Sequence, residues 1–203
     1  MTADEMTSDQ LSDEEIVRRV QNGERSLFTI IFDRHYARLE RFVRRLGLRD
    51  ADLEDVLADT FSRALRGIQS FNPDSGAKYV SYLYAIARNL VTDKRREQAR
   101  LPEMELIEEL YTEPDSNAPS PMENVLWLEQ VDTVRQAMSR LTPSDREIIS
   151  LSYDRELSSR EIMEVMGKPS ITSVTTHLYK AIKKLRTLAY QVSREAPAAP
   201  SRM

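Results

Sequence analysis

Apolar residues recur at helical spacing along most of this chain. They repeat every three or four positions in residues 27–46, in residues 53–68 and in residues 79–100. Residues three and four apart lie on the same face of an α-helix, so each stretch predicts an amphipathic helix with one buried stripe. Gly47 ends the first stretch, and a loop over residues 69–78 separates the second from the third. The few glycines and many charged residues also favour helices over sheets.

A second group of helices is predicted in residues 141–188, where capping residues mark the helix ends. Thr142 precedes a proline and an acid, and Ser158 precedes Glu161 by three positions, the pattern of a capping box. Gly167 suits the left-handed conformation that closes a helix, and the Lys-Pro-Ser after it makes a turn. The spacing therefore predicts a helix-turn-helix, with one more amphipathic helix after the turn.

The helix after this turn has an apolar face and a polar face. The apolar stripe consists of Val174, Leu178, Ala181, Ile182 and Leu185. The polar face and its flank carry Ser173, Thr176, His177, Tyr179, Lys180, Lys183 and Lys184. Short hydrogen-bonding groups near the helix start suit base edges, and the later cations suit phosphates, so we interpret this helix as a DNA recognition helix. The alternative is a solvated lysine-rich helix in an ordinary three-helix bundle.

The charge of the chain is unevenly distributed. Residues 1–24 hold 2 basic and 7 acidic residues, and residues 101–125 hold 7 acidic and no basic residues. Residues 25–100 hold 15 basic against 10 acidic residues, and residues 126–203 hold 12 against 9. From Val165 onward the balance is 7 against 1. Although the net charge is −4, two basic blocks separated by an acidic one indicate a nucleic-acid partner.

These patterns predict an all-α fold of two small helical domains. The segment between them is rich in acids, proline and serine, which is typical of an extended, flexible linker. A solvated spacer without contacts would have the same composition. The expected units are an acidic N-terminal extension (1–24), a first domain (25–100), the acidic linker (101–125), a helix-turn-helix domain (126–190) and a disordered tail (191–203).

The last helix of the first domain combines tyrosines with cations. Its residues of interest are Tyr79, Tyr82, Tyr84, Arg88, Asn89, Lys94, Arg95 and Arg96. Base stacking on aromatic rings and neutralisation of phosphates are the two interactions by which proteins hold unpaired strands. Tyr79 and Tyr82 also share a face with apolar residues, so a core position is an equal alternative for either ring.

Several function classes are excluded or disfavoured by composition. The chain has no cysteine, and its two histidines, His35 and His177, lie far apart in sequence, so we expect neither a disulfide nor a metal site. We find no apolar run long enough for a membrane span and no signal peptide, and we expect a cytoplasmic protein. No phosphate-binding glycine loop, activated nucleophile or paired carboxylates are present, so we expect no enzyme and no cofactor.

Four segments, in their order along the chain, resemble the extracytoplasmic-function group of the sigma-70 family of bacterial transcription initiation factors. They are LEDVLADTFSRAL, SYLYAIARNLVTDKRR, LTPSDREIISLSY and SSREIMEVMG. Each motif is weak alone, but their order and spacing cover about residues 25 to 190. The resemblance implies that the first domain is sigma region 2 and that the helix-turn-helix domain is sigma region 4.

The resemblance also implies partners and contact residues. Core RNA polymerase would bind through its β′ clamp helices to Asp52, Asp55, Val56 and Asp59, and through its β flap to the second domain. The minus-10 element, melted to single strands with a flipped base at loop 69–78, would contact Asn72, Lys78, Tyr79, Tyr82, Arg88, Asn89, Lys94, Arg95 and Arg96. The double-stranded minus-35 element would contact Ser173, Thr176, His177, Lys180, Lys183 and Lys184. An anti-sigma factor is a further implied partner.

Two other classes of protein fit part of the sequence. A conventional helix-turn-helix repressor or activator could dimerise through residues 25–100, but this class gives no reason for a second basic helix rich in tyrosine. A sigma mimic could sequester an anti-sigma factor without binding DNA, but the lysines on the recognition helix argue against it.

Overall fold

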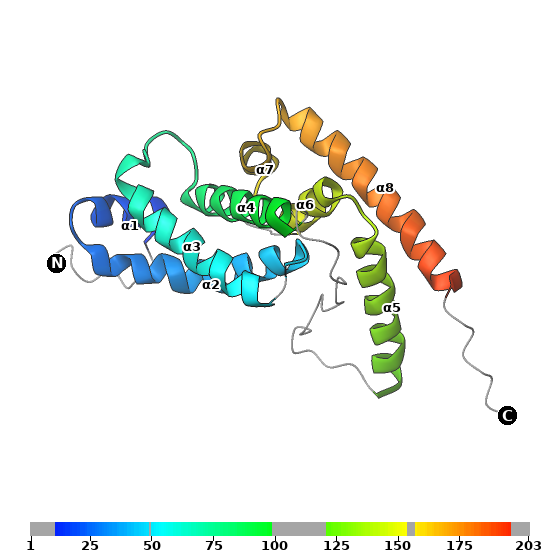
Figure 1. The fold of residues 1–203 in the computed structure, drawn as a ribbon. Coiled ribbons are helices and arrows are strands. Elements are labelled where there is room, and N and C mark those ends of the chain that lie inside the picture. The colour runs from blue at the N-terminus through cyan, green and yellow to red at the C-terminus, as the bar shows by residue number, and fades with distance from the viewer. Residues whose placement is uncertain (1–10, 49, 99–120, 154–156, 196–203) are drawn as a thin grey trace.

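The structure, a computed structural model, describes residues 11–48, 50–98, 121–153 and 157–195. The helices of the first domain are α1 (Asp13–Gln21), η2 (Arg25–Leu27), α2 (Phe28–Arg45), α3 (Asp50–Gly67), η3 (Ile68–Ser70) and α4 (Tyr79–Gln98). The second domain consists of α5 (Pro121–Ser139), α6 (Pro143–Ser152), α7 (Ser159–Met166) and α8 (Ile171–Glu195) (Figure 1). The predicted all-α fold of two helical domains is confirmed, and no strand occurs among these residues.

The core of the first domain lies between α2, α3 and α4. Phe42 of α2 packs against Tyr84 of α4 with ring centroids 5.0 Å apart. The predicted stripes supply most of the remaining core, including Ile31, Leu39, Val43, Leu53, Leu57, Leu83, Ala87 and Val91. Phe32 and Leu65 are exceptions, since each is 39% exposed although it follows the helical spacing.

Helix α1 is part of the first domain. Its Ile16, Val17 and Val20 are buried, and the helix packs against α2, α4 and η3. Ser12 caps the helix by accepting a hydrogen bond from the backbone N–H of Glu15. This segment was expected to belong to a separate acidic extension, because residues 1–24 hold 7 acidic and 2 basic residues. Its apolar residues nevertheless share one face and complete the core.

The second domain confirms the predicted helix ends. The Thr142 hydroxyl accepts from the Asp145 backbone N–H, Ser158 and Glu161 form a reciprocal capping box, and Gly167 closes α7 with φ at 60°. Val174 and Ala181 of α8 are buried in the core. The domain extends beyond its predicted limits because α5 begins at Pro121 and α8 continues to Glu195, which pairs with Arg140 at 2.7 Å. Residues 101–120 of the predicted linker and the tail from residue 196 lie outside the described residues.

The two domains pack against each other through α4. Helix α7 contacts α4, and α6 contacts α2 (Figure 1). One hydrophobic cluster runs through both domains and includes Leu90 of α4 and Leu151 of α6. This contact covers part of the helix that the sequence analysis assigned to minus-10 DNA.

Candidate nucleic-acid interface

The first residue of α4 belongs to the core. Tyr79 is fully buried, and its hydroxyl donates a hydrogen bond to the carbonyl oxygen of Ala64 at 2.9 Å. Burial raises the pKa of Tyr79, since the ionised phenol would lose its hydration. The predicted direct DNA contact does not fit this position, because a ring without exposed surface cannot stack on a base.

Tyr82, one turn further along α4, is half-buried at the edge of an aromatic cluster. Its ring lies 5.6 Å from the rings of both Phe71 and Tyr79. A Cβ at position 67 would collide with the Tyr82 hydroxyl, so Gly67 is what allows this ring to lie over the end of α3. Tyr82 is therefore the tyrosine of the predicted set whose ring borders solvent beside loop 69–78.

The exposed polar residues of the predicted minus-10 set are distributed over the loop and the outer side of α4. Asn72, Lys78, Asn89 and Arg96 are exposed. Lys94 is half-buried, and the Asp52 carboxylate at 3.2 Å raises its pKa by stabilising the charged form. Lys94, a predicted DNA contact, is thus ion-paired with Asp52, a predicted polymerase contact in the same domain.

Two arginines of the predicted minus-10 set face the second domain. Arg88 forms an ion pair with Glu147 of α6, and Arg95 lies near Glu147 and Arg146. Burial raises the pKa of Glu147 and outweighs the attraction of Arg88, which lowers it. Burial and then repulsion from Arg146 lower the pKa of Arg95. The chain itself therefore occupies this part of the α4 surface, a contact that no local sequence pattern indicates.

Helix α8, the predicted recognition helix, has most of its predicted DNA-contacting residues exposed to solvent. Thr176, Lys180 and Lys183 are exposed and Ser173 is half-buried. Tyr179, on the same face, is 70% exposed. These residues come from the first half of the helix, where a helix-turn-helix protein contacts base edges.

The flank of α8 is held by a buried carboxylate that the sequence analysis used only as a helix-start residue. Asp145 of α6 lies 3.0 Å from Nε2 of His177 and 2.7 Å from Nζ of Lys184. Burial alone would raise the pKa of Asp145, but hydrogen bonds from Lys184, Thr142 and His177 outweigh it and hold the pKa below its ordinary value. His177 and Lys184 thus fix the angle between α6 and α8 in addition to any contact with DNA.

The predicted polymerase-binding residues lie along α3. Asp55 and Asp59 are exposed, and Asp59 lies 3.6 Å from Arg63. Val56 is 1% exposed and packs in the core, so a direct contact with a partner does not fit it.

An aromatic cluster on α2 and α3 was missed by the sequence analysis. Phe32 lies 5.1 Å from Tyr36 and 4.7 Å from Phe61, measured between ring centroids. Phe32 follows the apolar period of α2, and only its 39% exposure distinguishes it from a core residue.

The described residues contain no group of three or more His, Cys, Asp or Glu side chains placed to hold a metal ion. None of their helices is long and apolar enough to span a lipid bilayer.

Two family models match the chain in the order of its domains. The model of sigma-70 region 2 matches residues 31–101, and the model of sigma-70 region 4 matches residues 132–185. The first match covers most of α2 and all of α3 and α4. The second covers α6, α7 and the first part of α8.

Curated relatives and a solved structure extend these matches. The extracytoplasmic-function RNA polymerase sigma factor BldN of Streptomyces coelicolor is 31% identical over 86% of this chain and 64% of BldN, so the chain spans less than two thirds of that protein. The RNA polymerase sigma factor NccH of Alcaligenes xylosoxydans xylosoxydans is 30% identical over 87% of this chain and 94% of NccH. The fold is similar to that of the sigma factor RpoE from Bartonella quintana, solved with the anti-sigma factor NepR, with a TM-score of 0.62, 19% identity and coverage of 80% and 96%.

Proposed function

Because this chain belongs to the extracytoplasmic-function group of the sigma-70 family, we propose that its two domains read the two elements of a promoter on behalf of core RNA polymerase. As an alternative sigma factor it directs transcription initiation. One observation supports the assignment of DNA contacts. The chain carries the basic helix α4 beside loop 69–78 and, later in the chain, the helix α8 with an exposed polar face, in the order of the two family models.

The minus-10 element is assigned to loop 69–78 and the outer surface of α4. Asn72 and Lys78 of the loop, with Asn89 and Arg96 of α4, are exposed and supply hydrogen bonds and positive charge. Tyr82 offers a ring beside the loop on which an unpaired base can stack. Arg88 and Arg95 join this surface when α6 and α7 move away and a phosphate replaces Glu147 as the partner of Arg88.

The minus-35 element is assigned to the first half of α8. Ser173 and Thr176 are placed to meet base edges in the major groove, while Lys180 and Lys183 neutralise phosphates. His177 and Lys184 act at the flank, where Asp145 orients them.

Core polymerase is assigned to α2 and α3. Exposed aromatic rings surrounded by charged residues are typical of the energetically dominant part of a protein interface. Phe32 is 39% exposed and packs against the half-buried Tyr36 and the buried Phe61. These rings lie on the same two helices as Asp55 and Asp59. We therefore place the β′ clamp helices on this surface and the β flap on the second domain.

The remaining assignments concern chemistry, location and regulation. Sigma factors are not enzymes, and we assign RNA synthesis to the polymerase alone. We also assign the chain to the bacterial cytoplasm. The structure of RpoE was solved with an anti-sigma factor, and we assign a partner of that class to this chain.

Transcription in vitro tests these assignments. Purified full-length protein is combined with bacterial core RNA polymerase and a library of genomic fragments, and the 5′ ends of the transcripts are mapped. We expect discrete start sites that require this protein and share two upstream elements. Binding to DNA as a dimer, without polymerase-dependent starts, would replace the proposal with the repressor class.

A further inference from the structure

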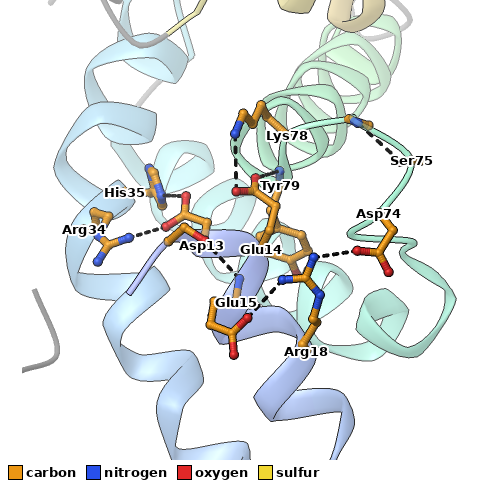
Figure 2. A network of polar contacts seen from close by, with 12 residues as sticks. Asp13, Glu14, Glu15, Arg18, Arg34, His35, Asp74, Ser75, Lys78 and Tyr79 are labelled. Atoms are coloured by element: carbon orange, nitrogen blue, oxygen red, sulfur yellow. Dashed lines mark hydrogen bonds and ion pairs between the residues drawn. The ribbon is translucent and has the colours of Figure 1, made fainter. Parts of the chain in front are cut away.

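One polar stripe of α1 faces the loop that we assign to minus-10 DNA. Glu14, Arg18 and Gln21 are spaced at i, i+4 and i+7, so they lie on one face of the helix. Each of them contacts a different part of the segment between residues 68 and 79 (Figure 2 shows Glu14 and Arg18).

The start of the loop is held by Gln21. Its side-chain amide donates hydrogen bonds to the backbone carbonyl oxygens of Ile68 and Phe71, both at 2.7 Å. In return, the Gln69 side chain donates to the carbonyl oxygen of Gln21 at 3.4 Å. Two of these contacts end on backbone atoms of the loop, so they fix its path independently of its side chains.

The middle of the loop is held by Arg18. One guanidinium nitrogen lies 2.5 Å from a carboxylate oxygen of Asp74, and another lies 3.0 Å from Glu15. Within the loop, the Asn72 side chain accepts from the backbone N–H of Asp74 at 3.0 Å and so closes a tight turn. Arg18 thus holds the residue on which this turn closes.

The end of the loop is held by Glu14. One carboxylate oxygen accepts from the backbone N–H of Tyr79 at 3.1 Å, and the other lies 3.5 Å from Nζ of Lys78 (Figure 2). Tyr79 is the first residue of α4, whose initial N–H groups have no partner within the helix. Glu14 therefore supplies a cap to α4 from a distant part of the chain.

Helix α1 is itself fixed to α2. Asp13 lies 2.5 Å from Nη1 of Arg34 and 2.6 Å from Nε2 of the buried His35 (Figure 2). Burial alone would raise the pKa of Asp13, but His35 and Arg34 outweigh it and hold the pKa below its ordinary value. The stripe therefore projects from a helix anchored to the domain core.

An open hollow of about 540 Å³ lies beside these contacts, and both α1 and the loop contribute to its lining. The α1 side supplies Arg18 and Gln21, and the loop side supplies Phe71, Asn72 and Asp74. We propose that Glu14, Arg18 and Gln21 are positioning residues that hold the loop in the shape that selects one unpaired base of the melted minus-10 strand. The proposal rests on the proposed function and assigns part of its sequence selectivity to a helix outside the DNA-contacting set.

The test compares full-length Glu14→Ala, Glu14→Gln and Glu24→Ala variants. Glutamine keeps an oxygen that can accept from Tyr79, whereas alanine removes the cap. Glu24 is the matched control, because it follows the end of α1 and pairs with Arg19 of that helix at 2.6 Å. Amide hydrogen exchange of residues 72–79 is measured first. We expect about tenfold faster exchange in Glu14→Ala, a smaller change in Glu14→Gln and none in Glu24→Ala.

The second readout uses each variant as holoenzyme with core polymerase and a pool of random-sequence single-stranded DNA. We expect wild type and Glu24→Ala to enrich one motif, and Glu14→Ala to lose preference at a single position, with unchanged affinity for core polymerase. Glu14→Gln should restore that preference. Unchanged loop exchange overturns the proposal, and so does faster exchange with the motif intact. If wild type binds core polymerase but enriches no motif, the assignment of minus-10 DNA fails. The exchange data then still test separately whether Glu14 holds the loop.

Discussion

The two helices assigned to DNA differ in how much of their contact surface is free. On α4, Arg88 is ion-paired with Glu147 and Arg95 lies under the second domain, whereas Thr176, Lys180 and Lys183 of α8 face solvent. The surface that we assign to double-stranded DNA is therefore exposed in this arrangement, and part of the surface that we assign to melted DNA is covered. From this difference we expect duplex contact to precede capture of the unpaired strand.

The carboxylate that anchors α8 gives the largest expected effect. Asp145→Asn removes a charge that three neighbouring groups stabilise, so we expect the free energy of unfolding to fall by about 2 kcal/mol at neutral pH. The pKa of Asp145 is lowered in the folded state, so its contribution is complete above the ordinary value of 3.8 and is lost as the pH falls through the lowered value.

Chemical denaturation at several pH values measures this contribution. The difference between wild type and Asp145→Asn should shrink as the pH drops below the ordinary carboxyl range. A difference that stays constant down to the most acid condition would mean that the carboxylate charge does not anchor α8.

Substituting Glu147 tests whether its ion pair with Arg88 keeps α4 covered by the second domain. Glu147→Ala leaves Arg88, Arg95 and Arg146 close together without their shared carboxylate, so we expect the domains to separate. Affinity of the full-length protein for single-stranded minus-10 DNA should rise about tenfold. The efficiency of energy transfer between dyes on α2 and α8 measures the separation of the domains, and we expect it to fall.

Glu164→Ala is the matched control for this change. Glu164 lies on α7 and is 3.7 Å from Arg160, a pair within one helix. If Glu147→Ala and Glu164→Ala both give the transfer efficiency and the DNA affinity of wild type, the contact between the domains does not limit strand capture.

The exposed state of α8 predicts a salt-dependent effect. Lys180→Ala should weaken binding to a minus-35 duplex about fivefold and lower the slope of log affinity against log salt by about 1, because one phosphate contact is lost. Arg194 is the control, since it lies over the ring of Tyr190 at 5.7 Å, near the other end of the same helix. Equal slopes for Lys180→Ala and Arg194→Ala would remove Lys180 from the DNA surface.

The smallest expected effect concerns the ring beside the loop. Glycine to alanine normally stabilises a helix by about 0.5–1 kcal/mol, but at position 67 the new Cβ collides with the Tyr82 hydroxyl. We expect Gly67→Ala to show no gain in Tm and to weaken single-strand binding about twofold. Adding Tyr82→Phe, which removes the colliding oxygen, should restore the gain in Tm. A full gain in Gly67→Ala alone would mean that Tyr82 moves freely.

Local features of this fold were predictable from the sequence. The caps at Thr142 and Ser158, the closing glycine at Gly167 and the buried stripe of α8 each depend on residues within a few positions of one another. The division of α4 into core and surface was only partly predictable, because Tyr79 and Tyr82 have the same spacing to their apolar neighbours. Their difference comes from Gly67 and Ala64 on another helix.

Contacts between distant segments could not be predicted. Nothing near Arg88 in the chain indicates Glu147 as its partner, and nothing near the loop indicates α1. The acids of α1 have the composition of a solvated extension, and their role follows only from the geometry that brings Glu14 to the start of α4. The distribution of charge along the sequence therefore predicted a nucleic-acid partner, but it did not predict which charged residues contact each other within the fold.

The way α1 holds the loop also bears on how promoter preference can change over evolutionary time. Gln21 and Glu14 form hydrogen bonds with backbone atoms of Ile68, Phe71 and Tyr79. Every residue type supplies those backbone atoms, except that proline at position 79 would lack the N–H. Exposed loop side chains are then free to vary without loss of the framework. A duplicated copy of this gene could acquire a new regulon through substitutions in the loop, while its fold stays the same.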